Sequence, residues 1–206
     1  MKLDIVLQEQ HSRGQLLLRS FFGFLYMVIP HYFCLFFLGI WGAILLFLTW
    51  WAILFTGRYP RAFFDYQVKL YRWNLRLSAR MFNLVDDYPA FGLNAEDSKT
   101  VFEVPYPERY SRLQLLLISF LGWLILIPHA FCLFFLAIGA LFVNFIAWWA
   151  VLITGKYPTG LHDYMVRFLR WFYRINVYLS FMTHGYPRFS GKPDEAAVAA
   201  EHFRNL

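Results

Sequence analysis

Two stretches of the chain decide its fold: IPHYFCLFFLGIWGAILLFLTWWAILF at residues 29–55 and IPHAFCLFFLAIGALFVNFIAWWAVLI at residues 127–153. Neither stretch contains an aspartate, glutamate, lysine or arginine. Each is longer than the roughly 20 apolar residues that an α-helix needs to cross the hydrocarbon core of a bilayer. The sequence therefore predicts two apolar helices that lie in a membrane.

The composition of the whole chain is also typical of a membrane protein. Of its 206 residues, 59% are hydrophobic, 22% are aromatic and only 16% are charged, which is unlike a soluble globular domain. The formal net charge of +6 is small for a chain that binds nucleic acid, so we expect no nucleic-acid partner. Basic residues beside apolar runs instead suit the headgroups of anionic lipids, and we expect a bilayer that contains such lipids as a partner.

The two apolar stretches belong to a longer internal repeat. Residues 29–91 align with residues 127–189 without a gap, and about 28 of the 63 aligned pairs are identical. The match continues through a Thr-Gly-(Arg/Lys)-Tyr-Pro segment and ends in Tyr-Pro-x-Phe. We therefore predict two tandem units at residues 1–91 and 109–189, an acidic linker at 92–108 and a polar tail at 190–206.

Pro30 and Pro128 interrupt the apolar runs. A proline inside a helix removes one backbone hydrogen bond and clashes with the preceding turn, whereas it fits well as the first residue of a new helix. We therefore expect a helical hairpin in the membrane in each unit, at about residues 13–56 and 110–154, with its turn at the proline. The arm before each proline is near the lower limit of length for a crossing.

Glycine and proline mark the end of each apolar run. Gly57 and Gly155 can take the left-handed conformation that closes a helix. Pro60 and Pro158 suit the start of the helix that follows. We expect these four residues to form a structural turn in each unit.

An amphipathic helix is expected after each turn, at about residues 60–85 and 158–183. Basic residues recur there at spacings of three and four, which places them on one face of a helix. We expect these helices to lie in the membrane interface, with the basic face toward lipid headgroups. The candidate residues for binding headgroups or a partner are Arg58, Lys69, Arg72, Arg76, Arg80, Lys156, Arg167, Arg170 and Arg174.

The distribution of charge also limits the orientation of the units. If each unit crossed the membrane once, the two basic helices would face opposite sides, against the positive-inside tendency. An even number of crossings places both basic helices, both termini and the acidic linker on one side, which we expect to be cytoplasmic. The predicted fold class is thus an all-α, multi-pass integral membrane protein, with units related by a pseudo-twofold axis along the membrane normal.

The sequence offers few residues for chemistry. His31 and His129 occupy equivalent positions and could hold a haem or a metal between the two units. Beside a proline that starts a helix, they can equally serve a turn by bonding water or a free backbone group. Cys34 and Cys132 lie within apolar runs, where a thiol usually packs as a small hydrophobe. Because the sequence has no phosphate-binding loop, nucleophile elbow or cysteine cluster, we expect no catalytic residue, no metal and no cofactor.

The repeated pattern resembles a known family. Ile-Pro-His, an apolar stretch that ends in tryptophan, Thr-Gly-(Arg/Lys)-Tyr-Pro, Arg-Trp and a closing Tyr-Pro-x-Phe occur together in residues 29–91 and again in 127–189. This pattern is similar to that of a bacterial membrane protein family of unknown function, domain-of-unknown-function family 4389. The resemblance implies a location in the bacterial cytoplasmic (inner) membrane, and it brings no activity or catalytic residue with it.

Three functions stay open from the sequence. The leading hypothesis is a non-enzymatic accessory or scaffold subunit that binds anionic lipids, other membrane protein subunits, or further copies of itself. One alternative is a small transporter or channel component built on the pseudo-twofold repeat. The other alternative is a redox membrane subunit that binds haem or a metal through His31 and His129.

Overall fold

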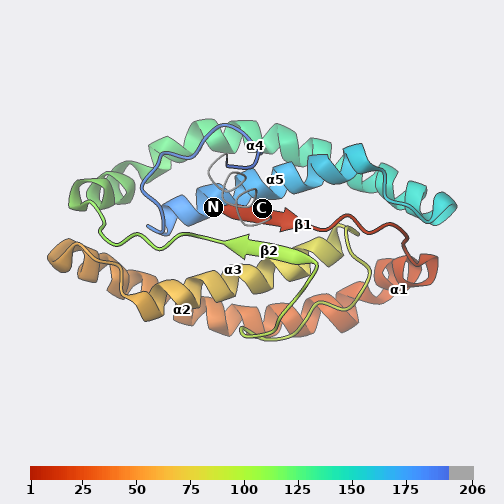
Figure 1. Cartoon of the computed structure of the whole chain (residues 1–206), viewed down its shortest axis with the longest axis horizontal. Helices are drawn as coiled ribbons and strands as arrows, with labels where there is room; N and C mark the ends of the chain where they lie inside the picture. The colour runs from red at the N-terminus through yellow and green to blue at the C-terminus, as the bar shows by residue number, and fades with distance from the viewer. Residues whose placement is uncertain (195–206) are drawn as a thin grey trace, which may run out of the picture.

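The chain is mostly helical in the computed structural model, which describes residues 1–194 (Figure 1). The predicted polar tail therefore lies, from residue 195 on, outside the described residues. In chain order the elements are β1 (Lys2–Ile5), α1 (Arg13–Gly23), the π-helical segment η1 (Phe24–Val28), α2 (Ile29–Thr56), α3 (Arg61–Met81), β2 (Thr100–Glu103), α4 (Arg112–Thr154) and α5 (Thr159–Leu179).

The apolar runs form two long bowed helices, and the expected hairpin turns at Pro30 and Pro128 are wrong. One helical stretch continues from Arg13 to Thr56, and α4 continues from Arg112 to Thr154 with Pro128 inside it. The residues beside each proline are apolar and include no glycine or asparagine that would favour a turn. One lost hydrogen bond is then a smaller cost than the unpaired backbone groups of two new helix ends.

The first long helix accommodates its proline through a local change of helix type. η1 lies directly before the first residue of α2, and Pro30 occupies the second position of α2. A π-helical segment widens the helix locally and is a common way to absorb an irregularity of this kind. α4 contains no such segment, and Pro128 lies in continuous α-helix.

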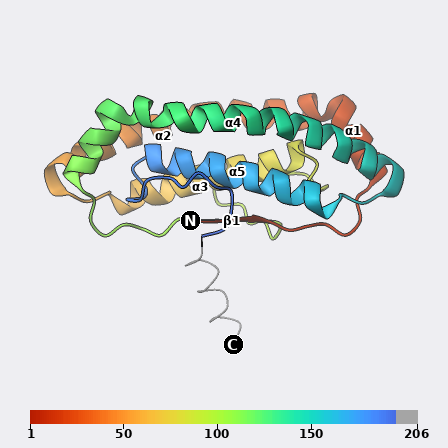
Figure 2. The same cartoon turned by 90° about the horizontal axis from the view of Figure 1, so that it is seen from above.

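The helices are arranged in layers (Figure 2). The two long helices form one layer, α3 and α5 lie beneath them, and the two strands lie beyond α3 and α5. The ends of the long helices contact each other, because the Trp50 indole donates to Ser119 Oγ at 2.7 Å and the Trp148 indole donates to Ser20 Oγ at 2.8 Å. The C-terminal end of each long helix therefore packs against the N-terminal part of the other.

The turns between the layers depend on glycine and proline. Gly57 ends α2 with φ of 68°, and Gly155 ends α4 with φ of 73°, so both residues take the left-handed conformation that glycine tolerates best. Pro60 and Pro158 directly precede α3 and α5 as extended N-cap residues. These two turns reverse the chain and lay each amphipathic helix under its own long helix.

Both halves share one hydrophobic core. Its members include Leu16 and Ile53 from the first long helix, Leu115 and Val151 from α4, and residues from both lower helices, among them Leu75 and Met165. The apolar faces of α3 and α5 therefore point into the molecule. This core, rather than the long helices alone, holds the halves together.

A two-stranded sheet was not expected in an all-α fold. β1 pairs with β2 in antiparallel register, with Leu3 opposite Phe102. The sequence segment KLDI alternates polar and apolar residues, and Leu3 and Ile5 are buried while Asp4 is exposed, which is the periodicity of a half-buried strand. The partner strand is the Thr-Val-Phe-Glu segment of the acidic linker.

Candidate functional site

The most extensive candidate surface is apolar and covers the outside of both long helices. We call it the apolar face; its strongly exposed members include Phe21, Phe24, Phe33, Phe36, Phe47 and Phe55 on the first long helix and Leu113, Phe120, Trp123, Phe131, Leu141, Phe142 and Ile153 on α4. Both helices are long and apolar enough to cross a membrane, and only 22% and 11% of their most apolar windows are buried. Exposure of this extent marks an interaction surface rather than the core of a soluble protein.

Two basic residues of α3, Arg76 and Arg80, point into the molecule. The Arg76 guanidinium donates to the backbone carbonyls of Ala90, Gly92 and Ala95. Arg80 is 1% exposed and donates to the Asp97 carboxylate at 2.6 Å. These two arginines therefore fix the loop that follows α3.

The basic residues of α5 make equivalent contacts. Arg174 donates to the carbonyls of Ser190 and Lys192 and to the Asp194 carboxylate. Arg170 donates to the carbonyls of Leu3 and Gly191. The expectation that Arg76, Arg80, Arg170 and Arg174 face lipid headgroups is therefore wrong, because all four are buried. The spacing of three and four residues correctly predicted that these arginines share one face of a helix. It could not predict whether that face meets solvent or a folded loop.

Two equivalent arginines clamp the sheet from opposite sides. Arg72 Nε donates to the Phe102 carbonyl at 2.9 Å, and Arg170 Nε donates to the Leu3 carbonyl at 3.0 Å. Leu3 and Phe102 are direct partners in the sheet. Each half of the chain therefore holds the strand nearest to it, and α3 and α5 meet at one small sheet.

The remaining predicted basic residues are at least partly accessible. Arg58, Arg72, Lys156 and Arg167 are exposed, and Lys69 is half-buried. Arg58 and Lys156 directly follow the glycines that end the long helices, beside the apolar face. Of the predicted set, these two are best placed to meet headgroups.

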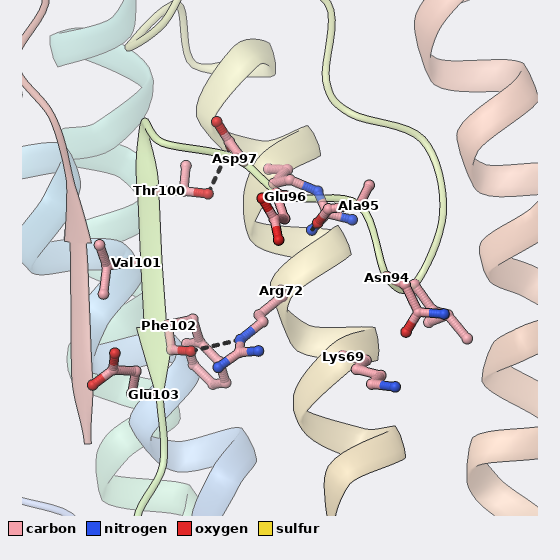
Figure 3. A pocket seen from close by; sticks show the side chains of 12 residues that line it. Lys69, Arg72, Asn94, Ala95, Glu96, Asp97, Thr100, Val101, Phe102 and Glu103 are labelled. Atoms are coloured by element: carbon pink, nitrogen blue, oxygen red, sulfur yellow. Dashed lines mark hydrogen bonds between the residues drawn. The ribbon is translucent and has the colours of Figure 1, made fainter.

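A polar cavity of about 410 Å³ lies between α3, the loop after it and β2 (Figure 3). Lys69, Arg72 and Arg76 supply positive charge, and Glu96, Asp97 and Glu103 supply negative charge. The Thr100 hydroxyl donates a hydrogen bond to the Asp97 carboxylate, and Arg72 donates one to the Phe102 carbonyl (Figure 3). Its lining contains no histidine or cysteine. Mixed charge of this kind suits a polar segment of a partner rather than an apolar small molecule.

The surroundings of Asp97 lower the pKa of its carboxyl group and so favour the ionised form. Burial raises the pKa of this carboxyl, but hydrogen bonds from Arg80, the Lys99 backbone N–H and Thr100 outweigh burial, so the pKa lies below its usual value. Burial lowers the pKa of Arg76, and the charge of Asp97 acts in the opposite direction. The cavity wall is thus a fixed network of charges.

Each candidate metal-binding histidine lies in an aromatic box of its own half. The first box consists of His31, Trp73, Tyr88 and Phe91, and the Trp73 indole donates to His31 Nδ1 at 2.7 Å.

The second box repeats the first with His129, Trp171, Tyr186 and Phe189, and its indole-to-imidazole bond is 3.1 Å. Both histidines are fully buried. The repeated Ile-Pro-His, Arg-Trp and Tyr-Pro-x-Phe motifs therefore meet in space as a packing unit. Among residues 1–194, no group of three or more His, Cys, Asp or Glu side chains could hold a metal ion.

The fold and these surfaces define a mostly helical protein with two helices long and apolar enough to cross a membrane. A family model described as a domain of unknown function, DUF4389, matches residues 119–191. The second half of the chain is therefore similar to that family over a region that includes the whole second aromatic box. No curated protein and no solved structure matches the chain.

Proposed function

We propose that the chain is a non-enzymatic scaffold subunit of the bacterial cytoplasmic membrane, built from two tandem copies of one unit. The observation that carries this proposal is the apolar face, which is exposed along both long helices while the polar loops, the sheet and the mixed-charge cavity are supplied by the other layers. A surface of this size needs lipid or a protein partner to cover it.

The shape of the long helices favours shallow insertion over crossing. A 44-residue helix is about 66 Å long at 1.5 Å per residue, about twice the roughly 30 Å of a bilayer core. The ends of α4 bend toward the layer of α5 (Figure 2). We propose that each long helix lies as an arch in one leaflet, with its ends at the headgroups. This keeps the polar segments on one side, as the sequence predicts, but with no complete crossing.

The rest of the molecule supports a scaffold role. The buried arginines and aromatic boxes are used in packing, which gives a rigid body beneath the arch. The cavity beside β2 offers both signs of charge to a partner segment outside the bilayer.

Labelling of single cysteines in sealed membranes distinguishes an arch in one leaflet from a hairpin that crosses the membrane. The background for each single cysteine is C34A/C132A. Ile127 is 54% exposed and lies in α4 next to Pro128, where a hairpin would turn on the far side of the membrane. We expect no labelling of Ile127→Cys by a membrane-impermeant thiol reagent from either side, and labelling of Arg167→Cys from the cytoplasmic side only. Labelling of Ile127→Cys from the periplasmic side would establish a crossing and contradict the proposed arch.

Purification in a mild detergent tests the scaffold role. We expect a stoichiometric protein partner, or retained anionic lipid, in mass analysis of the purified complex. A protein that extracts from membranes at alkaline pH without detergent would contradict membrane insertion. A lipid-free and partner-free monomer would contradict the scaffold role alone.

A further inference from the structure

A second cavity, of about 370 Å³, lies where α2 ends and α4 begins. It is lined by Thr56, Gly57, Arg58, Arg109, Tyr110 and Arg112. Three of these six residues are arginines, and none is an aspartate or glutamate. All the charged side chains of the lining are therefore positive.

Two backbone contacts build the cavity. The left-handed Gly57 ends α2, and its carbonyl accepts from the Tyr110 N–H at 2.8 Å. The Arg112 guanidinium donates to the Phe55 carbonyl at 2.9 Å, which satisfies one free carbonyl at the end of α2. Arg112 is therefore fixed against the wall by the fold itself.

The other two arginines have no such partner. The side chains of Arg58 and Arg109 are exposed and, within residues 1–194, make no hydrogen bond or ion pair. Because like charges around one cavity repel, an anion between them is favourable. The N-terminal end of α4 adds its partial positive charge at the same place. A guanidinium fork matches the geometry of phosphate oxygens.

The cavity lies at the rim of the apolar face. Phe55, directly before its first lining residue, is 70% exposed, and Leu113, directly after its last, is 68% exposed. If these two side chains enter the hydrocarbon region, the cavity between them lies at headgroup level. We propose that this cavity binds a phosphate group, supplied by the headgroup of an anionic phospholipid. This inference rests on the proposed membrane insertion.

The opposite end of the molecule shows what is particular to this site. There the His11 N–H donates to the Gly155 carbonyl at 2.7 Å, and Arg13 donates to the Ile153 carbonyl at 2.7 Å, as Tyr110 and Arg112 do here. Gln10 stands in the place of Arg109, and Lys156 in the place of Arg58. The end with Arg58 and Arg109 therefore binds the phosphate group more tightly.

Native mass spectrometry of the full chain in a neutral detergent, titrated with phosphatidylglycerol, tests the site. The double variant R58Q/R109Q removes the two unpartnered charges and leaves Arg112 in place. The matched control, R188Q/K192Q, removes two exposed charges that do not line the cavity. We expect a loss of affinity of roughly fivefold for each arginine removed from the site, and wild-type affinity in the control.

Equal affinity in the wild type and R58Q/R109Q, or an equal loss in the control, would overturn the inference. Competition by inorganic phosphate separates the two sources of the anion. Displacement of the lipid at low phosphate concentration would assign a free anion to the cavity, and persistence of the lipid at high concentration assigns the headgroup. Membrane extraction and cysteine labelling do not depend on Arg58 or Arg109, so failure of the proposed function is distinguishable from failure of this site.

Discussion

At the scale of single residues, the repeated motifs are explained by packing. The indole of Trp73 or Trp171 holds a buried imidazole, and the closing Tyr-Pro-x-Phe covers it. The sequence marked these residues as special because they repeat. It could not show that they meet, since they lie 42 positions apart along the chain.

The bond between Trp73 and His31 can be tested directly. Trp73→Phe leaves a buried imidazole nitrogen without its donor, so we expect the free energy of unfolding to fall by about 1 to 3 kcal/mol. Chemical denaturation in detergent measures the change. Trp41→Phe, at an exposed tryptophan of the apolar face, is the control, and an equal effect of the two substitutions would argue against the box.

Asp97 gives the fold a dependence on pH. Because its pKa in the folded chain lies below the unfolded value of 3.8, its stabilising effect is complete above that pH and is lost as the pH falls through the folded value. Asp97→Asn removes the buried charge partner of Arg80 and leaves only the more exposed Asp87 carboxylate, at 3.2 Å, so we expect a loss of about 1 to 3 kcal/mol at neutral pH.

Unfolding curves measured from neutral pH down to about 3 check this prediction. The wild type should lose stability below pH 4, and D97N should lose less over the same interval. Glu96→Gln, at an exposed carboxylate nearby, should behave like the wild type. Parallel curves for the wild type and D97N would show that the Arg80 pair does not titrate as described.

At the scale of elements, one glycine sets the distance between α4 and α5. A Cβ on Gly139 would collide with the Tyr164 hydroxyl, which donates to the Leu136 carbonyl at 3.0 Å. We expect Gly139→Ala to destabilise the protein by about 1 to 3 kcal/mol through overpacking. Gly160→Ala, where a Cβ meets no other atom, should be neutral or slightly stabilising. Thermal unfolding compares the two, and recovery in G139A/Y164F would confirm the collision.

Periodicity predicted most elements but not their surroundings. Gly57, Pro60, Gly155 and Pro158 located the turns, and the amphipathic pattern located α3 and α5, because these features are local. The proline rule failed at Pro30 and Pro128, since the cost of ending a helix in apolar surroundings exceeds that of one missing bond. Among the site residues, the exposure of Arg76 and Arg174 depends on how the irregular loop after each helix folds back, 14 to 20 residues later, which helical periodicity does not predict. Arg109 carried no motif at all.

At the scale of the whole molecule, the two halves are interdependent. Leu16, Ile53, Leu115 and Val151 are fully buried in one core to which both halves contribute. We expect a single cooperative unfolding transition, with far-UV circular dichroism and tryptophan fluorescence giving the same midpoint. Two separate midpoints would show that the halves fold as independent domains.

The clamp on the sheet also imposes an order of events during synthesis. β1 is made first, yet the Leu3 carbonyl bonds to Arg170, 167 positions later in the chain. β1 can pair with β2 earlier, but its bond to Arg170 can form only after α5 has been synthesised. Contacts of such long range are slow to form, so we expect the bond between Leu3 and Arg170 to be among the last that fix the sheet.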